Sequence, residues 1–217
     1  MFQTFSLNHV WYLVQASGWT LVLSAIALIG GGLGGCLVAL MRVSMFAPLR
    51  GLAAAYIYVI QGTPLLVLLF IAYFGLSYLG LELPAIVAAA LGLTLYASAF
   101  LGEIWRGVIQ SVARGQWEGA EALALNWPQT MRLVVIPQAF RSAIPPTIGF
   151  SVQVVKNTAL ASIVGFIELT RAGQIVASAT FQPLQVYLTV GAIYFVICSD
   201  LSYLSRVVDR RVSASAA

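Results

Sequence analysis

The sequence predicts an all-helical membrane protein with five transmembrane helices, and three observations lead to that fold class. Hydrophobic residues make up 60% of the 217-residue chain. Charged residues make up only 8%, whereas soluble domains carry about 25%, so a water-soluble fold could not cover its surface with so few. The charged residues also gather in short intervals, and the apolar runs between them are long enough to cross a bilayer.

Each apolar run of about 20 residues or more is interpreted as one span. The five spans are predicted at about 19–41, 55–79, 84–104, 138–165 and 184–205. The segment 1–18 is expected to be periplasmic or interfacial, the segment 19–207 to form the membrane domain, and the segment 208–217 to be a cytoplasmic tail.

The basic residues predict the orientation of the chain, because cytoplasmic loops carry an excess of Lys and Arg. With the N-terminus outside and the C-terminus in the cytoplasm, only Arg171 lies clearly outside. Eight basic residues then fall on the cytoplasmic side: Arg42, Arg50, Arg106, Arg114, Arg132, Arg206, Arg210 and Arg211. This bias also explains the net charge of +4 without a nucleic-acid partner.

The first span contains the run Gly30–Gly35, in which small residues recur at a spacing of four. Such spacing lets membrane helices approach closely. Two interpretations fit equally well, namely a contact with another subunit and ordinary packing inside the bundle.

Pro145 and Pro146 interrupt the fourth apolar region. Two prolines remove two backbone donors and disfavour a continuous helix. Either the backbone breaks at membrane depth, where protein or a water-filled cavity must cover it, or the prolines mark the cytoplasmic start of the span.

The chemistry of an enzyme is missing from the sequence. The only lysine follows a valine, so the chain has no phosphate-binding Gly-Lys loop. The only histidine, His9, stands alone, and Cys36 and Cys198 lie in apolar runs without metal-ligand or disulfide spacing. We therefore expect no catalytic residue, no metal and no cofactor in this chain.

Polar residues within the apolar regions are the candidates for a substrate path or gate. Lys156, followed by Asn157 and Thr158, lies in the fourth span, where ionisable residues are costly and often functional. A lysine that only bonds backbone carbonyls is the alternative. Gln61 and Thr63, at the start of the second span, are further candidates that spacing alone does not decide.

Glu103 and Arg106 end the third span, three residues apart on one helical face. Residues at that spacing are neighbours on a helix, so the two are predicted to form a structural ion pair.

The polar interval at about 113–132 predicts a cytoplasmic helix pair. Its first helix is expected from Gln116 to about Leu123, and a turn follows near residues 124–126. Asn126 then stands as N-cap with Gln129 at the capping-box position of a second helix, which leads into the membrane. The small residues Ala120 and Ala124 predict a face of the first helix that docks closely against a partner.

These residues carry a family resemblance. The chain resembles the permease subunit of bacterial ATP-binding-cassette importers, specifically the polar amino acid branch of histidine, glutamine and glutamate permeases. That family has a loop of the form E-A-A-x-x-x-G, nine further residues, then I-x-L-P. In this sequence the loop is matched, with substitutions, by Glu118, Gly119, Ala120, Ala124, Val134, Ile136 and Pro137. Three further blocks, at 61–76, 102–118 and 154–174, are similar to the branch in the same order.

The resemblance implies a type I importer core of five spans in the bacterial inner membrane. It implies a second permease subunit, of the same chain or a paralogue, two ATPase subunits and a periplasmic amino-acid-binding protein. ATP and Mg²⁺ would be used by the ATPases, and Glu118–Ala124 would be the coupling helix that seats in them. A secondary transporter or channel subunit is the alternative, disfavoured because such chains usually contain internal repeats.

The sequence departs from the family pattern at several positions. Gln61, Leu68 and Ala159 replace arginine, glutamine and serine, so this subunit is expected to bind substrate less directly than a partner if those positions bind it. Ala124 replaces a glycine, and a left-handed alanine there would cost about 1 kcal/mol. Whether Ala124 or Asn126 makes the bend stays open.

Overall fold

The computed structural model describes residues 4–214, with side chains described for residues 4–210, and this part of the chain is all-helical. The side chain of Arg211 and the end of the predicted tail, 215–217, lie outside the described residues. The α-helices are α1 Leu7–Val43, α2 Ala47–Gly62, α3 Leu65–Phe70, α4 Leu76–Tyr78, α5 Ala85–Gln110, α6 Arg114–Ala122, α7 Trp127–Thr130, α8 Ile136–Asn157, α9 Leu169–Thr180 and α10 Pro183–Ala214.

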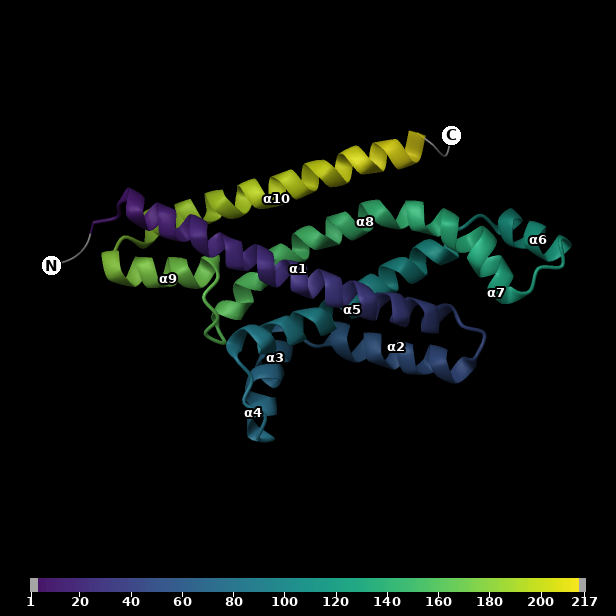
Figure 1. The fold of residues 1–217 in the computed structure, drawn as a ribbon, viewed down its shortest axis with the longest axis horizontal. Helices are drawn as coiled ribbons and strands as arrows, with labels where there is room; N and C mark the ends of the chain where they lie inside the picture. The colour runs from purple at the N-terminus through teal and green to yellow at the C-terminus, as the bar shows by residue number, and fades with distance from the viewer. Residues whose placement is uncertain (1–3, 215–217) are drawn as a thin grey trace.

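The long helices α1, α5, α8 and α10 run along the long axis of the molecule (Figure 1). The N-terminus lies at one end, and the short helices α6 and α7 lie at the other, which is also the end toward which α10 runs (Figure 1). Three further segments join the helices, namely the π-helical η1 (Ile71–Gly75) and η2 (Met131–Val135) and the 3₁₀-helical η3 (Thr158–Ser162).

Three described helices are long and apolar enough to cross a membrane, namely α1, α5 and α10. The second predicted span, 55–79, is wrong as one straight helix. The chain bends by 101° between Ala47–Gly62 and Leu65–Tyr78, and only as a bent pair do these segments make a fourth candidate. Pro64 explains the bend, because it offers no N–H and pushes Thr63 into extended backbone (φ −103°, ψ 129°).

Helix α1 begins at Leu7, so most of the segment 1–18 continues the first span as helix. Its 37 residues are about 55 Å long at 1.5 Å per residue. That length exceeds the hydrocarbon core of a bilayer, about 30 Å. The N-terminal part of α1 packs against α9 and α10, with which Leu13 and Ala16 form a buried cluster.

Helix α8 is continuous through Pro145 and Pro146, so the expected break of the backbone is not found there. The helix starts nine residues earlier, at Ile136, and the prolines lie in its interior. Tertiary contacts hold it. Ser205 Oγ on α10 donates to the Pro145 carbonyl at 3.2 Å, and Trp105 Nε1 on α5 donates to Thr147 Oγ1 at 2.8 Å.

The glycine run of α1 packs inside the chain, against α5. A Cβ atom built on Gly31 would lie 2.4 Å from Cβ of Ala97, and one on Gly35 would lie 2.9 Å from Cβ of Leu101. Real Cβ atoms do not approach so closely, so the two backbones touch only because these residues are glycine. Of the two interpretations of Gly30–Gly35, packing within the bundle is the one the structure shows.

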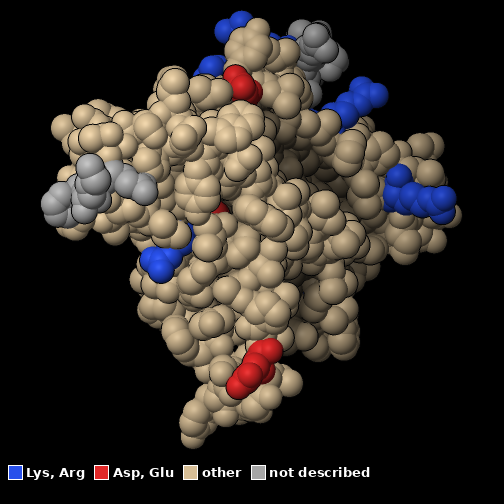
Figure 2. Space-filling view, turned by 60° about the vertical axis from the view of Figure 1, so that its left-hand side comes forward, with Lys and Arg blue, Asp and Glu red and all other residues tan. Residues whose placement is uncertain are grey.

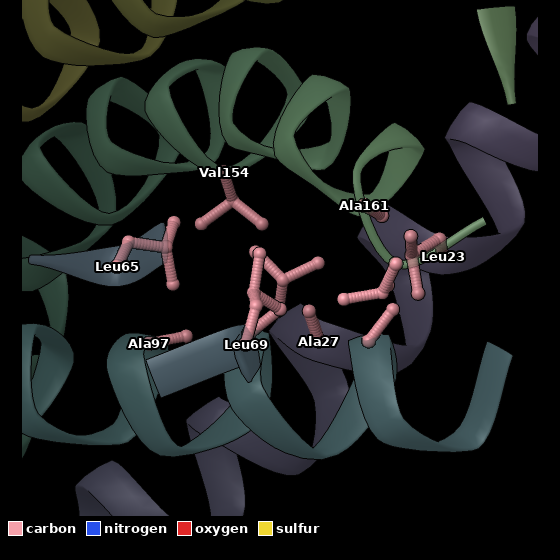
Figure 3. Packing of buried hydrophobic residues seen from close by; sticks show 10 residues of the cluster. Leu23, Ala27, Leu65, Leu69, Ala97, Val154 and Ala161 are labelled. Carbon is pink, nitrogen blue, oxygen red and sulfur yellow. The ribbon is translucent and has the colours of Figure 1, made fainter. Parts of the chain in front are cut away.

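The main core lies where α1, α3, α5, α8 and η3 meet (Figure 3). Leu69 of α3 and Leu93 of α5 are fully buried there, together with Val154 of α8. Small residues fill the gaps between these side chains: Ala27, Ala89, Ala97 and Ala161. The bend at Pro64 thus brings α3 into the middle of the bundle.

The outer surface of the bundle is mostly apolar. Charged side chains are few and scattered on the face in Figure 2. Large apolar side chains are exposed along the long helices, among them Leu33 and Leu37 of α1 and Phe195 of α10. This pattern is typical of helices whose outer faces contact lipid.

Candidate functional site

The segment α6–α7 is a bent helix pair whose bend lies at Ala124. Helix α6 ends in a Schellman motif, since Leu125 N donates to Ala120 O at 3.1 Å and Ala124 N donates to Glu121 O at 2.8 Å. Ala124 takes the left-handed position of that motif with φ 53°, where glycine is usual. Asn126 is extended instead (φ −74°, ψ 164°), so Ala124 makes the bend.

Asn126 caps α7 as the sequence predicts. Its Oδ1 accepts a hydrogen bond from Gln129 N at 3.0 Å, and its own N donates to Gln129 Oε1 at 2.9 Å. Helix α7 continues through the wide turns of η2 into α8. Those turns lie directly before Pro137, which has no N–H to offer to the carbonyl four residues earlier.

The predicted small-residue docking face is wrong in one respect. Ala120 is 2% exposed and faces the rest of the chain, while only Ala124 of the pair is on the surface. The exposed surface of α6 includes Glu118 and Gly119, and Leu123, which follows the helix, is 75% exposed. Ala120 and Ala124 differ because the left-handed turn after Leu123 rotates Ala124 away from the face on which Ala120 lies.

The α6–α7 helix pair is packed against the ends of the long helices α5 and α8. Trp117 of α6 and Trp127 of α7 pack against the cluster of Ile109, Met131 and Val135. Gln138 Nε2 of α8 also donates to Gln116 Oε1 at 2.9 Å. A force applied to α6 would therefore reach α5 and α8 directly.

One cavity brings together two groups of residues that the sequence analysis singled out separately. It has a volume of about 690 Å³ and lies between α2 and α5, where Gln61, Thr63, Glu103 and Arg42 are among its lining residues. Arg106 Nε donates to both carboxylate oxygens of Glu103 at 2.9 Å, so these two residues form the predicted ion pair. Arg42 Nε lies 3.8 Å from Glu103 Oε2.

Lys156, Asn157 and Thr158 end α8 and do not line that cavity. Lys156 is exposed, and Asn157 Oδ1 accepts a hydrogen bond from Gln153 Nε2 at 3.1 Å. Thr158 is fully buried and donates to Val155 O at 2.7 Å. Lys156 is therefore not part of the cavity that Gln61 and Thr63 line.

Sequence reasoning missed a buried carboxylate, Glu168, which is 0% exposed. It caps α9 by accepting from Thr170 N at 2.9 Å and Arg171 N at 2.8 Å. Tyr194 OH of α10 donates to its Oε2 at 2.9 Å, and Thr20 Oγ1 of α1 lies 3.5 Å away. One signal was present, since an acidic residue just before a helix is a common N-cap.

Burial raises the pKa of the Glu168 carboxyl above its usual range, and the hydrogen bonds from Thr170 and Arg171 oppose that rise. The group lies between η3 and α9, directly after the segment that holds Thr158. It therefore joins α1, α10 and the start of α9 to the turn between η3 and α9.

A family model decides what kind of protein carries these features. The model described as "Binding-protein-dependent transport system inner membrane component" matches residues 31–214. The chain belongs to this family.

Relatives of this inner membrane component have been named in several bacteria. This chain is 36% identical over 200 residues to the probable amino-acid ABC transporter permease protein YckA of Bacillus subtilis. The alignment covers 92% of this chain and 88% of the relative. It is 37% identical over 196 residues to the probable glutamine ABC transporter permease protein GlnM of the same organism, covering 90% and 91%. The nopaline transport system permease protein NocM of Agrobacterium fabrum is 37% identical, covering 88% and 84%.

Solved structures share the fold of this inner membrane component. A chain of an amino acid ABC transporter crystallised with histidines superposes with a TM-score of 0.91 at 35% identity, covering 96% of this chain and 100% of that one. A chain of the MetNI methionine ABC transporter in an inward-facing conformation superposes with a TM-score of 0.80, and its 21% identity makes it evidence for the fold alone.

As a permease component, the chain is an inner membrane protein that does not hydrolyse ATP itself, since the ATPase of such a transporter is a separate subunit. The absence of a phosphate-binding loop from the sequence agrees with that division of labour.

Proposed function

We propose that this permease component moves a polar amino acid into the cytoplasm by alternating access, driven by two separate ATPase subunits. The observation that carries the proposal is the α6–α7 segment. It is a bent helix pair, exposed on the surface of the chain, whose residues match the family's coupling loop with substitutions. It is anchored on α5 and α8. The amino acid class is supported by the named relatives and by the transporter crystallised with histidines.

In this proposal five spans cross the membrane, namely α1, the bent pair α2–α3, α5, α8 with η3, and α10. The N-terminus is outside and the C-terminus is in the cytoplasm. The positions of three arginines support that orientation. Arg42 lies at the end of α1, Arg106 near the end of α5 and Arg114 in α6, so all three are at or beside α6–α7, which we call the coupling segment.

The coupling surface of α6 would seat in a groove of the ATPase. Glu118, Gly119 and Ala124 are exposed and would contact the ATPase. Ala120 is buried and Pro137 lies at the start of α8, so these two would stabilise the helix pair without touching the ATPase. A second permease subunit and a periplasmic amino-acid-binding protein complete the assembly, and ATP and Mg²⁺ bind the ATPases.

Two polar regions are the candidate substrate path or gate. Gln61 and Thr63 line the cavity beside the Glu103–Arg106 ion pair, and Lys156, Asn157 and Thr158 lie at the C-terminal end of α8. A substrate that crosses the bundle would meet these regions in turn, the lysine first if it enters from the outside.

The experiment that tests this function is uptake by the purified assembly in liposomes. The chain is expected to co-purify with ATPase subunits. Uptake of labelled amino acids is expected to need ATP on the side of the membrane where the ATPase subunits lie. Uptake that persists without ATP while an ion gradient is kept would reject the proposal. Competition among a panel of amino acids then identifies the substrate.

A further inference from the structure

A second cavity lies beside the α6–α7 segment, at the junction of the α1–α2 turn with the end of α5. Its volume is about 440 Å³, within the range of small-molecule pockets, which is about 300–1,000 Å³. Two arginines and two tryptophans line it, namely Arg42, Arg50, Trp117 and Trp127. We call it the Arg42–Arg50 pocket.

The guanidinium of Arg42 has donors that the chain does not use. Its side chain is 26% exposed, and its Nε is buried without a hydrogen-bond partner among the described residues. The nearest carboxylate is 3.8 Å away on Glu103, whose two oxygens both accept hydrogen bonds from Arg106. Because Nε is buried, an external acceptor would have to reach the terminal N–H groups of the guanidinium, which make no hydrogen bond to a described residue.

Arg50 faces the same pocket with most of its donors free for a ligand. Its Nη1 donates to Ser44 O at 2.9 Å and to Met45 O at 2.7 Å, which holds the α1–α2 turn. A guanidinium has five N–H donors, so other donors remain. None of the described residues that line the pocket is acidic, and the pocket is therefore positively charged.

The pocket lies where the membrane helices end, and lipid headgroups are expected at that level. It is formed at the last residues of α1 and α5 and the first turns of α6 and α7, where the membrane helices end. Its two tryptophans are half-buried, and tryptophan is enriched at membrane–water interfaces. The leaflet on this side is the cytoplasmic one in the orientation proposed above, and that leaflet carries anionic lipids.

We propose that the Arg42–Arg50 pocket binds the phosphate group of an anionic phospholipid. The planar guanidinium presents a fork that matches phosphate oxygens in pairs. Basic pockets between membrane helices on the cytoplasmic side are suited to such headgroups. The apolar lining residues Val43 and Ile109 would contact the glycerol and the start of the acyl chains. A lipid held there would join the α1–α2 turn to the coupling segment.

The proposal is tested on the purified full-length chain, with any co-purifying subunits, by native mass spectrometry. Phosphatidylglycerol and phosphatidylcholine are titrated in parallel, since they share the phosphate but differ in net charge. Phosphatidylglycerol is expected to be retained about fivefold better. The variants Arg42→Gln and Arg50→Gln are each expected to lower that retention about fivefold, in keeping with the contribution of one arginine at a charged membrane surface.

The matched control is Arg206→Gln, which removes the same charge from an exposed position on α10 outside the pocket. It is expected to leave retention unchanged. Arg50→Lys serves as the second variant if the glutamine variants fold poorly, and it should keep the charge but lose part of the retention.

Three results would overturn the proposal. Equal loss in Arg206→Gln would show diffuse charge rather than a pocket, and equal retention of both lipids would show no preference for an anion. Displacement of phosphatidylglycerol by millimolar inorganic phosphate would identify free phosphate as the ligand. Because binding is measured without transport, failure of the transport proposal would leave this result readable.

Discussion

The hydroxyl of Tyr194 lies 2.9 Å from Oε2 of Glu168 and donates a hydrogen bond to it. The same hydroxyl lies 3.0 Å from Thr170 Oγ1. Tyr194 stands in the middle of α10, and Glu168 caps α9, so one contact joins the last long helix to the turn that precedes α9. The carboxyl is fully buried and its acceptors are engaged from three helices, which makes it the polar centre of the end of the bundle where α9 lies.

Tyr194→Phe is expected to lower the stability of the chain by about 1–3 kcal/mol, because it removes a hydrogen bond from a buried carboxyl. For a chain of this size each kcal/mol corresponds to about 2–4 °C in the unfolding midpoint. Thermal unfolding of the purified protein in detergent measures the shift. Glu168→Gln and the double variant complete a cycle, and a coupling of about 0.5–3 kcal/mol is expected for residues in contact.

The control for that cycle is Tyr187→Phe, on the same helix. Tyr187 is 46% exposed, and the structure shows no hydrogen bond from its hydroxyl to any described residue. Its removal is expected to change stability by no more than about 0.5 kcal/mol. Equal shifts in the two phenylalanine variants would mean that the Glu168 contact contributes nothing.

Gly31→Ala is expected to destabilise the chain by about 1–3 kcal/mol, because the new methyl group would lie 2.4 Å from Cβ of Ala97 and force α1 away from α5. Gly18→Ala on the same helix is the control, since a Cβ there meets nothing within 4 Å. That substitution is expected to stabilise α1 by up to about 1 kcal/mol through helix propensity. Shifts of the same sign in both variants would contradict the close packing.

Local signals in the sequence predicted what depends on local backbone chemistry. The cap at Asn126 and the pair Glu103–Arg106 depend on residues three apart on one chain, and the structure shows both. The bend at Pro64 has an equally local cause, yet a hydropathy average over 55–79 conceals it, because both arms of the bend are apolar.

Contacts between segments far apart in the sequence could not be predicted from such local signals. Glu168 meets Thr20 across 148 positions of the chain and Tyr194 across 26, and nothing near Glu168 in sequence names those partners. The continuity of α8 through Pro145 is likewise a tertiary effect, since the helix is held by contacts with α5 and α10. A regular helix would place Ala120 and Ala124 on one face, but the left-handed turn at Ala124 moves Ala124 away from the face of Ala120.

Ala124→Gly is expected to stabilise the turn after α6 by about 1 kcal/mol, because glycine has no Cβ penalty at φ 53°. Ala122→Gly, within α6, should have the opposite effect and destabilise the helix by a similar amount. Hydrogen exchange of the amides of residues 118–126 compares the two. Slower exchange in the first variant and faster exchange in the second are the expected results, and the reverse order would place the bend elsewhere.

Glu118→Lys is expected to weaken attachment of the ATPase at least about tenfold, which corresponds to about 1.4 kcal/mol, while membrane insertion stays normal. Glu118 is exposed and pairs with Arg114 at 2.9 Å, so the new lysine would repel that arginine and reverse the charge of the coupling surface. Pull-down of the ATPase with the purified chain measures the effect. Glu82→Lys, in the exposed turn before α5, makes the same charge change away from α6 and should leave attachment intact. Unchanged attachment in Glu118→Lys would remove Glu118 from the coupling surface.

Lys156→Met is expected to reduce amino acid uptake about tenfold or more without affecting assembly, because an exposed ammonium at the end of α8 can pair with the carboxylate of a passing substrate. Uptake by reconstituted liposomes, with the amount of assembled complex measured in the same sample, separates the two effects. Lys156→Arg keeps the charge and is expected to restore most of the uptake. If Lys156→Met transports normally, the lysine only occupies the end of the helix. If both variants fail equally, the shape of the side chain matters more than its charge.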